Sequence, residues 1–301
     1  DVLGSRGLGD VYKRQPKYIV IIREFVTRRY PYIHKIILNR LSKKGVIFYW
    51  DFDDNILEGK NITREDFDFF SKLCSRICVT HKFLADLVSQ KYKNKVLLVP
   101  TTDGDIYKLF SHELIRIKEA EIQSTIRIIW VGTHVNLVYL ENVVKYLDEA
   151  ARILKQIEDR KLILQVICNQ PLIYISSFLE IENISWSRDK AIEGIQSAHI
   201  GIMPLSDNLY TRGKGGFKLV QYLSIGVPGL ATNVGFNASV LNTKCGRLIN
   251  EKHPEEWIRA IREISDPNKW SSYAYNAYKN WCTNFSYESN LNLWKTLFGL
   301  N

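Results

Sequence analysis

Short apolar runs that are typical of β-strands alternate with longer amphipathic segments along most of this chain. Because most of the predicted strands are separated from the next by a predicted helix, the alternation favours parallel sheets covered by helices, arranged in two Rossmann-like halves. Strands are expected at 18–22, 46–51, 77–80, 96–99, 126–131, 162–168, 184–186, 200–204, 229–232 and 247–249. Helices are expected at 32–44, 64–73, 82–92, 137–157, 172–179, 190–196, 217–225, 255–265, 268–281 and 288–297, with a polar connector at 101–125.

The length of 301 residues exceeds one typical domain, so two domains are expected. Residues 1–15 do not fit the alternation, and they end abruptly before the apolar run at Tyr18. They resemble translated adapter sequence at the end of a gene fragment, and we interpret them as a non-native leader. The expected divisions are a partial N-terminal domain at 16–124, a C-terminal domain at 125–283, and a last helix at 284–301 that packs back on the N-terminal domain.

A glycine-rich basic turn precedes the predicted helix at 217–225. Between Asp207 and Glu251 the chain has no acidic residue, although Arg212, Lys214 and Lys218 lie in this window. Positive charge at a helix N-terminus is unfavourable, whereas a phosphate there is bound by backbone N–H groups and clamped by cations. The window therefore predicts a phosphate site; the alternative is a solvated basic loop before an ordinary helix.

The overall charge and the cysteines narrow the class of protein. The formal charge of +9 suits anionic sugar nucleotides, an anionic membrane surface or nucleic acid. We expect no nucleic-acid partner, because the basic residues form no run interleaved with aromatic residues. The five cysteines are scattered without metal-ligand spacing, which fits a reducing cytoplasm and no metal site. No run of 18 apolar residues and no signal peptide are present in the sequence.

Five blocks of the sequence carry a family resemblance. They are the aspartates of 51–54 after a buried strand, the segment 99–107, the strand end 129–132, the segment 185–187, and 201–205 joined to 212–228. In this order and spacing they resemble the retaining glycosyltransferases of family four, which have the two-domain GT-B fold. The resemblance runs from about Tyr18 to the C-terminus. It implies an α/β protein with two Rossmann-like domains, the N-terminal one incomplete, with two or three βα units of about 30 residues missing before Tyr18.

The resemblance also implies a donor-binding site in the C-terminal domain. Arg212 and Lys218 are expected to hold the donor diphosphate, and Gln221 stands where many members use a glutamate to hold the ribose. Many members also carry a glutamate eight residues before that position, where this chain has Gly213. The family's arginine and lysine after the first glycine turn are absent here. The alternative for Trp186 is a tryptophan buried in the core, and the alternative for residues 132–133 is an ordinary turn. The predicted donor-binding residues are Gly132, Thr133, Trp186, Arg212, Lys214, Gly216, Lys218 and Gln221.

The acidic strand end at 51–54 is the candidate catalytic element. Asp51, Asp53 and Asp54 lie where related enzymes often carry a histidine in the cleft. Such carboxylates can orient an acceptor hydroxyl or act as a base. The alternative is a helix cap or a solvated turn.

The expected function is a bacterial, metal-independent glycosyltransferase without a cofactor. It would move a sugar from a nucleotide-diphosphate donor, with retention, to a glycan or lipid-linked acceptor, in the cytoplasm or at the inner face of the membrane. A nucleotide-sugar epimerase or phosphorylase on the same fold is one alternative, and a truncated donor-binding module without turnover is another. We expect the chain as written to bind nucleotide but to transfer little sugar until its upstream segment is restored.

Overall fold

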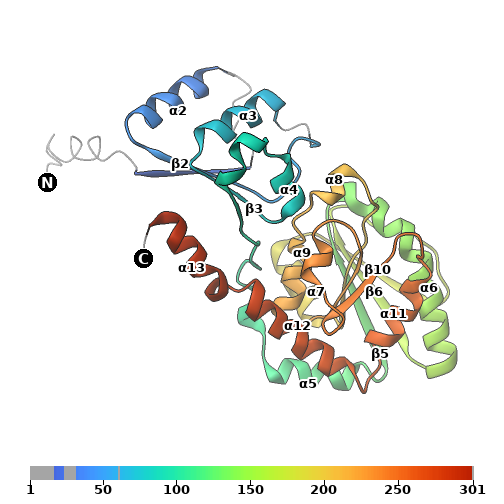
Figure 1. Cartoon of the computed structure of the whole chain (residues 1–301). Coiled ribbons are helices and arrows are strands. Elements are labelled where there is room, and N and C mark those ends of the chain that lie inside the picture. Colours follow the sequence, from blue (N-terminus) through green and yellow to red (C-terminus); the bar gives the residue numbers. More distant parts are fainter. Residues whose placement is uncertain (1–16, 24–31, 60–61, 300–301) are drawn as a thin grey trace, which may run out of the picture. The chain divides into compact units, whose positions relative to one another are not determined.

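The computed structural model describes residues 17–23, 32–59 and 62–299. The chain divides into two compact units, unit 1 at Asp1–Val99 and unit 2 at Pro100–Asn301, each with its own parallel sheet (Figure 1). The predicted α/β fold class with two Rossmann-like sheets is confirmed. The interpretation of residues 1–15 as a leader lies outside the described residues. Every helix in the described ranges is too short or too polar to cross a lipid bilayer.

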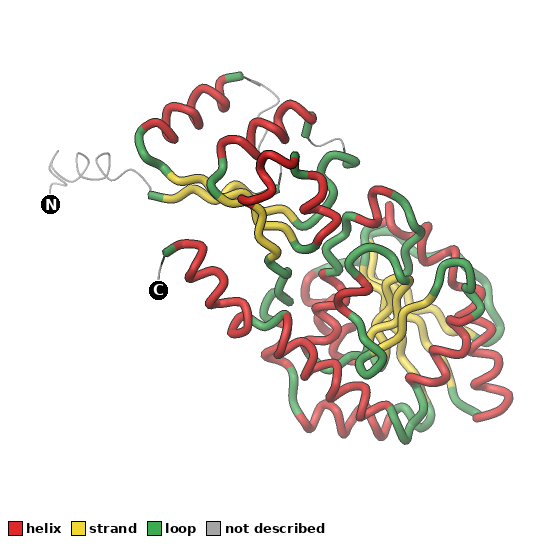
Figure 2. The backbone as a smooth tube through the Cα atoms, in the orientation of Figure 1, coloured by secondary structure: helices red, strands yellow, loops and turns green. Residues whose placement is uncertain are grey.

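Unit 1 contains a four-stranded parallel sheet in sequential order, β1-β2-β3-β4. Sequential parallel strands joined by right-handed crossovers place their helices on one face of the sheet, as Figure 2 shows for this unit. On that face Trp50, Phe67 and Phe70 are fully buried and pack ring against ring. The elements are β1 (Tyr18–Ile22), α2 (Ile33–Lys43), β2 (Ile47–Phe52), α3 (Arg64–Leu73), β3 (Arg76–Val79), α4 (Lys82–Leu87), the 3-10 helix η1 (Gln90–Lys95) and β4 (Val96–Leu98).

Unit 2 contains a six-stranded parallel sheet in the order β10-β9-β8-β5-β6-β7. The chain builds this sheet outward from β5 (Thr125–Val131) through β6 (Lys161–Cys168) to β7 (Leu179–Ser185). It then returns to the other side of β5 with β8 (Ile200–Met203), β9 (Gly229–Thr232) and β10 (Gly246–Ile249). The strand order therefore reverses between β5 and β8, and such a reversal is where open α/β sheets bind ligands.

Helices cover both faces of this second sheet, with an apolar cluster on each. One cluster joins α6, α11 and the start of α12 to the sheet, and the other joins α7, α9 and α10 to it. The elements are η2 (Ile106–Leu109), α5 (His112–Glu121), η3 (His134–Asn136), α6 (Leu137–Glu158), α7 (Arg188–Ser197), α8 (Leu209–Arg212), α9 (Phe217–Ser224), α10 (Asn237–Val240), α11 (Glu256–Ile264), α12 (Trp270–Asn284) and α13 (Tyr287–Phe298).

A glycine sets how closely α9 approaches the sheet. A Cβ atom on Gly201 of β8 would lie 2.2 Å from Cδ2 of Tyr222, a fully buried ring of α9. No side chain fits in that space, so the glycine lets helix and strand pack at close range. The distance between α9 and β8 is therefore set by the contact of the Tyr222 ring with the main chain of Gly201.

Two parts of the sequence interpretation need correction. The helix predicted at 172–179 is wrong: residues 172–178 form an irregular segment before β7. Its Ser176 hydroxyl accepts the N–H groups of Phe178 and Leu179 and donates to Asp148. The outward side chains of Ile173 and Ile175 are 80% and 96% exposed, which made the segment look like an apolar helix in sequence.

The second correction concerns the connector at 101–125. It contains η2 and helix α5, whose Ile106, Ile115 and Ile122 are buried in the clusters of unit 2. Because of these contacts the units divide after Val99, whereas the sequence placed the boundary after residue 124. The packing of the last helix on unit 1 stays a prediction.

Candidate functional site

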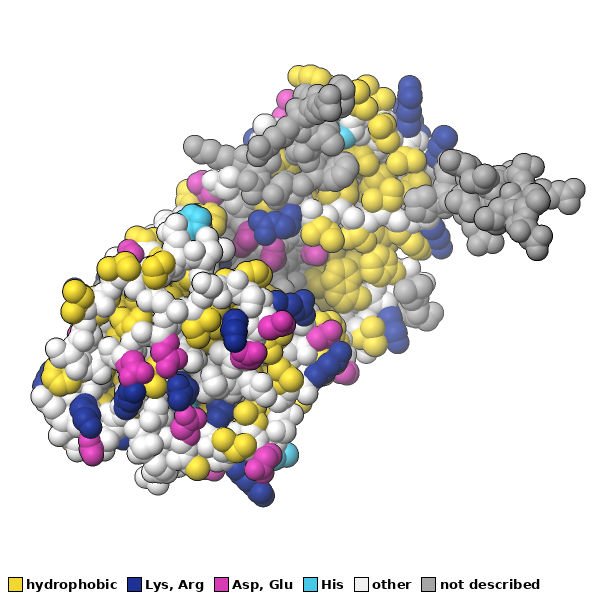
Figure 3. Space-filling model, turned by 180° about the vertical axis from the view of Figure 1, so that it is seen from behind, with side chains coloured by type: hydrophobic (Ala, Val, Ile, Leu, Met, Phe, Trp, Pro, Cys, Tyr) yellow, Lys and Arg dark blue, Asp and Glu magenta, His cyan; other side chains and the backbone are white. Residues whose placement is uncertain are grey.

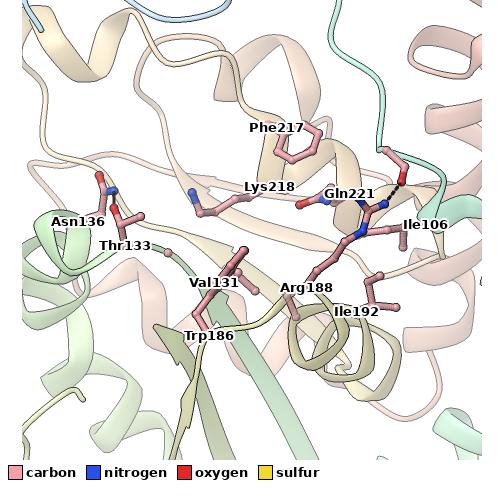
Figure 4. Close-up of a pocket in the computed structure, with 13 residues that line it drawn as sticks. Ile106, Val131, Thr133, Asn136, Trp186, Arg188, Ile192, Phe217, Lys218 and Gln221 are labelled. Carbon is pink, nitrogen blue, oxygen red and sulfur yellow. Dashed lines mark hydrogen bonds between the residues drawn. The ribbon is translucent and has the colours of Figure 1, made fainter. Parts of the chain in front are cut away.

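A cavity of about 430 Å³ opens in unit 2 beside the carboxyl end of β5 (Figure 4). Its walls come from the end of β5, the segment after β7, the first turns of α7 and α9, and the turn before η2. This is the reversal point of the strand order, so the cavity occupies the position where ligands bind in folds of this kind. The lining residues are Gly104, Ile106, Val131, Gly132, Thr133, Asn136, Trp186, Arg188, Ala191, Ile192, Phe217, Lys218 and Gln221.

The glycine turn at the end of β5 contributes main-chain atoms to one wall of the cavity. A Cβ atom on Gly132 would lie 2.4 Å from Cη2 of Trp130, so only glycine fits there. Thr133 follows, and its Oγ1 accepts a hydrogen bond of 2.8 Å from Nδ2 of Asn136. The adjoining backbone is fixed by Asn169, whose Oδ1 accepts the N–H of His134 at 2.9 Å. The glycine turn therefore presents backbone and a small hydroxyl to a ligand.

The first turn of α9 provides the opposite wall. Gly216 precedes it with φ +67°, a left-handed conformation that glycine adopts without strain, and no side chain caps this helix end. The first N–H groups of a helix have no partner within the helix, and the helix dipole makes their surroundings positive. Phe217, Lys218 and Gln221 line the cavity from this turn, and the Lys218 side chain extends toward Thr133 and Asn136 in Figure 4.

The charge of the lining is positive. Its charged side chains are Lys218 and Arg188, and none of the lining residues is a carboxylate. The rest of the lining combines apolar surface from Ile106, Ile192 and Trp186 with backbone from glycines. Such a wall suits a ligand that has a flat apolar part and an anionic part. Elsewhere on unit 2, at the lower left of Figure 3, cations and acids are interspersed.

Five predicted donor-site residues line this one cavity, and three do not. Gly132, Thr133, Trp186, Lys218 and Gln221 come together there. Trp186 is 56% exposed, so the alternative of a core tryptophan does not describe it. The other three are Arg212, Lys214 and Gly216.

Arg212 and Lys214 have partners outside the lining. Nε and an Nη of Arg212 donate to the two carboxylate oxygens of Asp207 at 2.6 and 2.8 Å. This pair raises the pKa of Arg212 and lowers that of Asp207. The ammonium of Lys214 lies 4.5 Å from the ring centre of Tyr210. No missing anion is needed to balance Arg212, because Asp207, just outside the acid-free window, already does so.

Arg188 is a lining residue that the sequence interpretation missed. It is the first residue of α7, and one of its Nη atoms donates to the carbonyl oxygen of Gly104 at 3.2 Å. A cation at a helix N-terminus is unfavourable by itself, which is the signal that identified Lys218. Applied to the segment after Trp186, the same signal finds Arg188.

The predicted catalytic aspartates lie in unit 1, at the carboxyl end of β2. Burial, and to a lesser degree Asp53, raises the pKa of Asp51 to about 6. Burial and Asp54 also raise the pKa of Asp53, while Arg23 pairs with Asp54 at 3.2 Å. A carboxylate with a pKa near neutrality is suited to exchange protons. Their catalytic role stays a prediction, as does the absence of a metal; the described residues hold no group of three metal-ligating side chains.

Comparison with known proteins points to one class of enzyme. Residues 125–266 match the family described as glycosyl transferases group 1. This segment holds β5 to α11 and most of the cavity lining. Unit 2 therefore contains a domain similar to group 1 glycosyl transferases. No sequence among curated proteins matches the chain.

Solved structures share the fold of the whole chain at low identity. HepE of Anabaena, solved with UDP and glucose, has a TM-score of 0.64 at 10% identity, covering 99% of this chain and 83% of its own. The trehalose-phosphate synthase of Burkholderia xenovorans has a TM-score of 0.59 at 11% identity, covering 95% and 72%. TarM has a TM-score of 0.55 at 11% identity; this chain spans 51% of its length. These likenesses establish the GT-B type of fold.

Proposed function

We propose that this protein is a glycosyltransferase that takes a sugar from a nucleotide-diphosphate donor and transfers it with retention. The observation that carries the proposal is the cavity at the strand reversal, where Lys218 and the uncapped start of α9 meet a lining without carboxylates. The donor diphosphate would lie at that helix start, held by backbone N–H groups and by the lysine. The base and ribose would lie along Trp186 and Gln221.

The same groups can promote the reaction. When the sugar leaves, the nucleoside diphosphate gains negative charge, and fixed cations and helix N–H groups stabilise that charge in the transition state. Because Lys218 and these N–H groups can take this role, we propose metal-independent transfer. Asp51, Asp53 and Asp54 are proposed to orient the acceptor or accept its proton. Arg212 and Lys214 stay proposed donor ligands. To bind the donor, Arg212 would have to leave Asp207 and Lys214 would have to leave Tyr210.

The donor and acceptor are proposed from chemistry and likeness. HepE and TarM were solved with UDP, so a uridine nucleotide is the first probe to test. The acceptor is proposed to be a glycan or a lipid-linked glycan, with the protein in the cytoplasm or at the inner face of the membrane. A nucleotide-sugar epimerase is less favoured, because the cavity lining offers no acid–base pair of carboxylates.

Titration calorimetry with UDP tests the donor site. Lys218→Ala should weaken UDP binding by about 1.5–3 kcal/mol, the range for losing a hydrogen bond to a charged group. Lys155→Ala, which removes an exposed cation at the far end of α6, should leave the affinity unchanged. Affinity for UDP should also fall as NaCl rises, because charge complementarity contributes to it.

The result decides between the candidate functions. Unchanged affinity in Lys218→Ala would remove this lysine from the site, and no UDP or UDP-glucose binding by the wild-type chain would refute the proposed donor. Release of UDP from UDP-glucose that depends on added acceptor would establish transfer. Binding without release, under any acceptor tried, favours the donor-binding module.

A further inference from the structure

A tight turn forms one wall of the cavity, close to where the chain enters unit 2. Gly104 and Asp105 have φ values of +70° and +75°, so two successive residues are left-handed, and the second is not a glycine. The turn is closed by Asp103, which is fully buried and whose Oδ2 accepts the N–H of Tyr107 at 2.6 Å. A left-handed aspartate is strained, so this conformation persists only while neighbouring groups hold it.

Two side chains of the cavity hold the backbone of this turn. An Nη atom of Arg188, from α7, donates to the carbonyl oxygen of Gly104 at 3.2 Å. Nε2 of Gln221, from α9, donates to the carbonyl oxygen of Asp103 at 3.4 Å. The first bond is at the upper end of the ordinary range and the second exceeds it, so the turn is not held tightly. Figure 4 draws Arg188 with its hydrogen bond as a dashed line, and Gln221 lines the same cavity.

These two side chains can serve the turn and a ligand together. A guanidinium has five N–H donors and a primary amide has two, so neither group is used up by one carbonyl. Arg188 also pairs readily with phosphate oxygens, because its planar fork matches them. A diphosphate in the cavity would fix the guanidinium, and the fixed guanidinium would hold Gly104 more firmly.

We propose that Arg188 is a further donor-binding residue that couples occupancy of the cavity to the order of the turn at 103–107, with Gln221 as the second attachment. The inference rests on the proposed donor site. The coupling must act in both directions: a ligand that orders the turn binds more weakly when the turn is loosened. The ligand class is a nucleoside diphosphate, since a neutral sugar would not engage the guanidinium in this way.

Hydrogen exchange of the intact chain, with and without UDP, tests this coupling. The Tyr107 amide is the reporter, because its N–H closes the turn onto Asp103. In Arg188→Ala without ligand, exchange at 103–108 should speed up roughly 2- to 12-fold, the effect of losing one ordinary hydrogen bond. In the wild type, saturating UDP should slow exchange there, and in Arg188→Ala it should not.

Two further variants separate coupling from charge and from folding. Lys190→Ala removes a cation from the same helix, where Lys190 pairs with Glu193, and should behave like wild type. Arg188→Lys keeps the charge but not the fork, so it should retain part of the UDP affinity and lose the protection of the turn. A residue that only supports folding is not expected to lose the protection of the turn while keeping part of the UDP affinity.

The outcomes distinguish this inference from the proposed function. UDP binding that is equal in the wild type and Arg188→Ala, or protection of the turn by UDP in both, would overturn the coupling while leaving the donor site intact. Failure of the wild type and of every variant to bind UDP would overturn both the coupling and the proposed donor site. Weakened binding together with lost protection in Arg188→Ala, and neither in Lys190→Ala, would support the inference.

Discussion

Replacing Gly201 with alanine should disturb both the stability of unit 2 and its donor site. The added Cβ would lie 2.2, 2.4 and 2.7 Å from Cδ2, Cγ and Cε2 of Tyr222, whereas carbon atoms normally approach to about 3.5–4.0 Å. Tyr222 is fully buried among the apolar residues between α9 and the sheet, so its ring cannot swing away. Helix α9 must therefore shift away from β8, and Lys218 must shift with it.

The expected cost follows from these overlaps. Overpacking of a rigid core typically costs about 1–3 kcal/mol. For a unit of about 200 residues this lowers Tm by roughly 2–12 °C. Because Lys218 is displaced, we also expect the Kd for UDP to rise about tenfold, or 1.4 kcal/mol. Differential scanning calorimetry and UDP titration measure the two effects.

Two comparisons make this prediction specific to the contact. Gly194→Ala should cost less, because its new Cβ would meet the flexible Cδ1 ends of Ile129 and Ile167 rather than a ring. In a double-mutant cycle, Tyr222→Leu should relieve Gly201→Ala by at least about 1 kcal/mol of coupling energy. A Gly201→Ala protein with the wild-type Tm and the wild-type Kd for UDP would refute the argument that this glycine positions α9.

Three further predictions concern single side chains. Gln221→Glu should change the UDP affinity by about 1 kcal/mol in either direction, and Gln221→Leu should cost more; equal titrations of the leucine variant and wild type would place the ribose elsewhere. Burial raises the pKa of Asp51 from 3.8 to about 6, so its ionised form destabilises unit 1 above pH 6. Asp51→Asn should therefore raise the free energy of unfolding at pH 8 by at most about 3 kcal/mol, with the gain vanishing below pH 4 in urea titrations. Burial lowers the pKa of Lys118 from 10.5 to about 7, and among the described residues its Nζ has no hydrogen-bond partner, lying 5.6 Å from the ring centre of Trp270. Lys118→Met should stabilise unit 2 by about 1–3 kcal/mol below pH 7, and less as pH approaches 10.5, and the opposite trend in urea titrations would contradict this.

Periodicity in the sequence was enough to predict most of the sheets. The strands at 18–22 and 229–232 and the helix at 64–73 agree with the structure residue for residue. The helix at 64–73 buries Phe67 and Phe70 on one face, and the strand at 229–232 is buried throughout, so local pattern and tertiary packing agree there. The helix predicted at 172–179 failed because Ile173 and Ile175 are apolar but exposed, a situation that composition alone cannot reveal. Helix α5 was missed because half of its side chains are charged, with Ile115 as its one buried isoleucine.

The sequence predicted those cavity-lining residues that follow from local backbone pattern, but not the side-chain partners around the cavity. Gly132 and Lys218 were identified as candidates because a glycine after a strand and a cation after a glycine turn are recognisable local sequence patterns. Arg212 was interpreted as a phosphate ligand, yet Asp207 five residues earlier pairs with it. The interaction partner of a side chain depends on its rotamer and on tertiary packing, and the spacing of a motif specifies neither.

The strand reversal also bears on how this site can change during evolution. Residues of β5 and β8 are paired only at Ile128 with Ile200 and at Ile129 with Gly201, whereas β5 and β6 are paired along seven residues. Beyond Ile129 the two strands are no longer paired, and the cavity lies beside that end of β5. The opening therefore follows from the course of the main chain at the strand reversal. An exchange at Gln221, which lines the cavity from α9, should therefore change what the cavity binds more than whether the sheet forms.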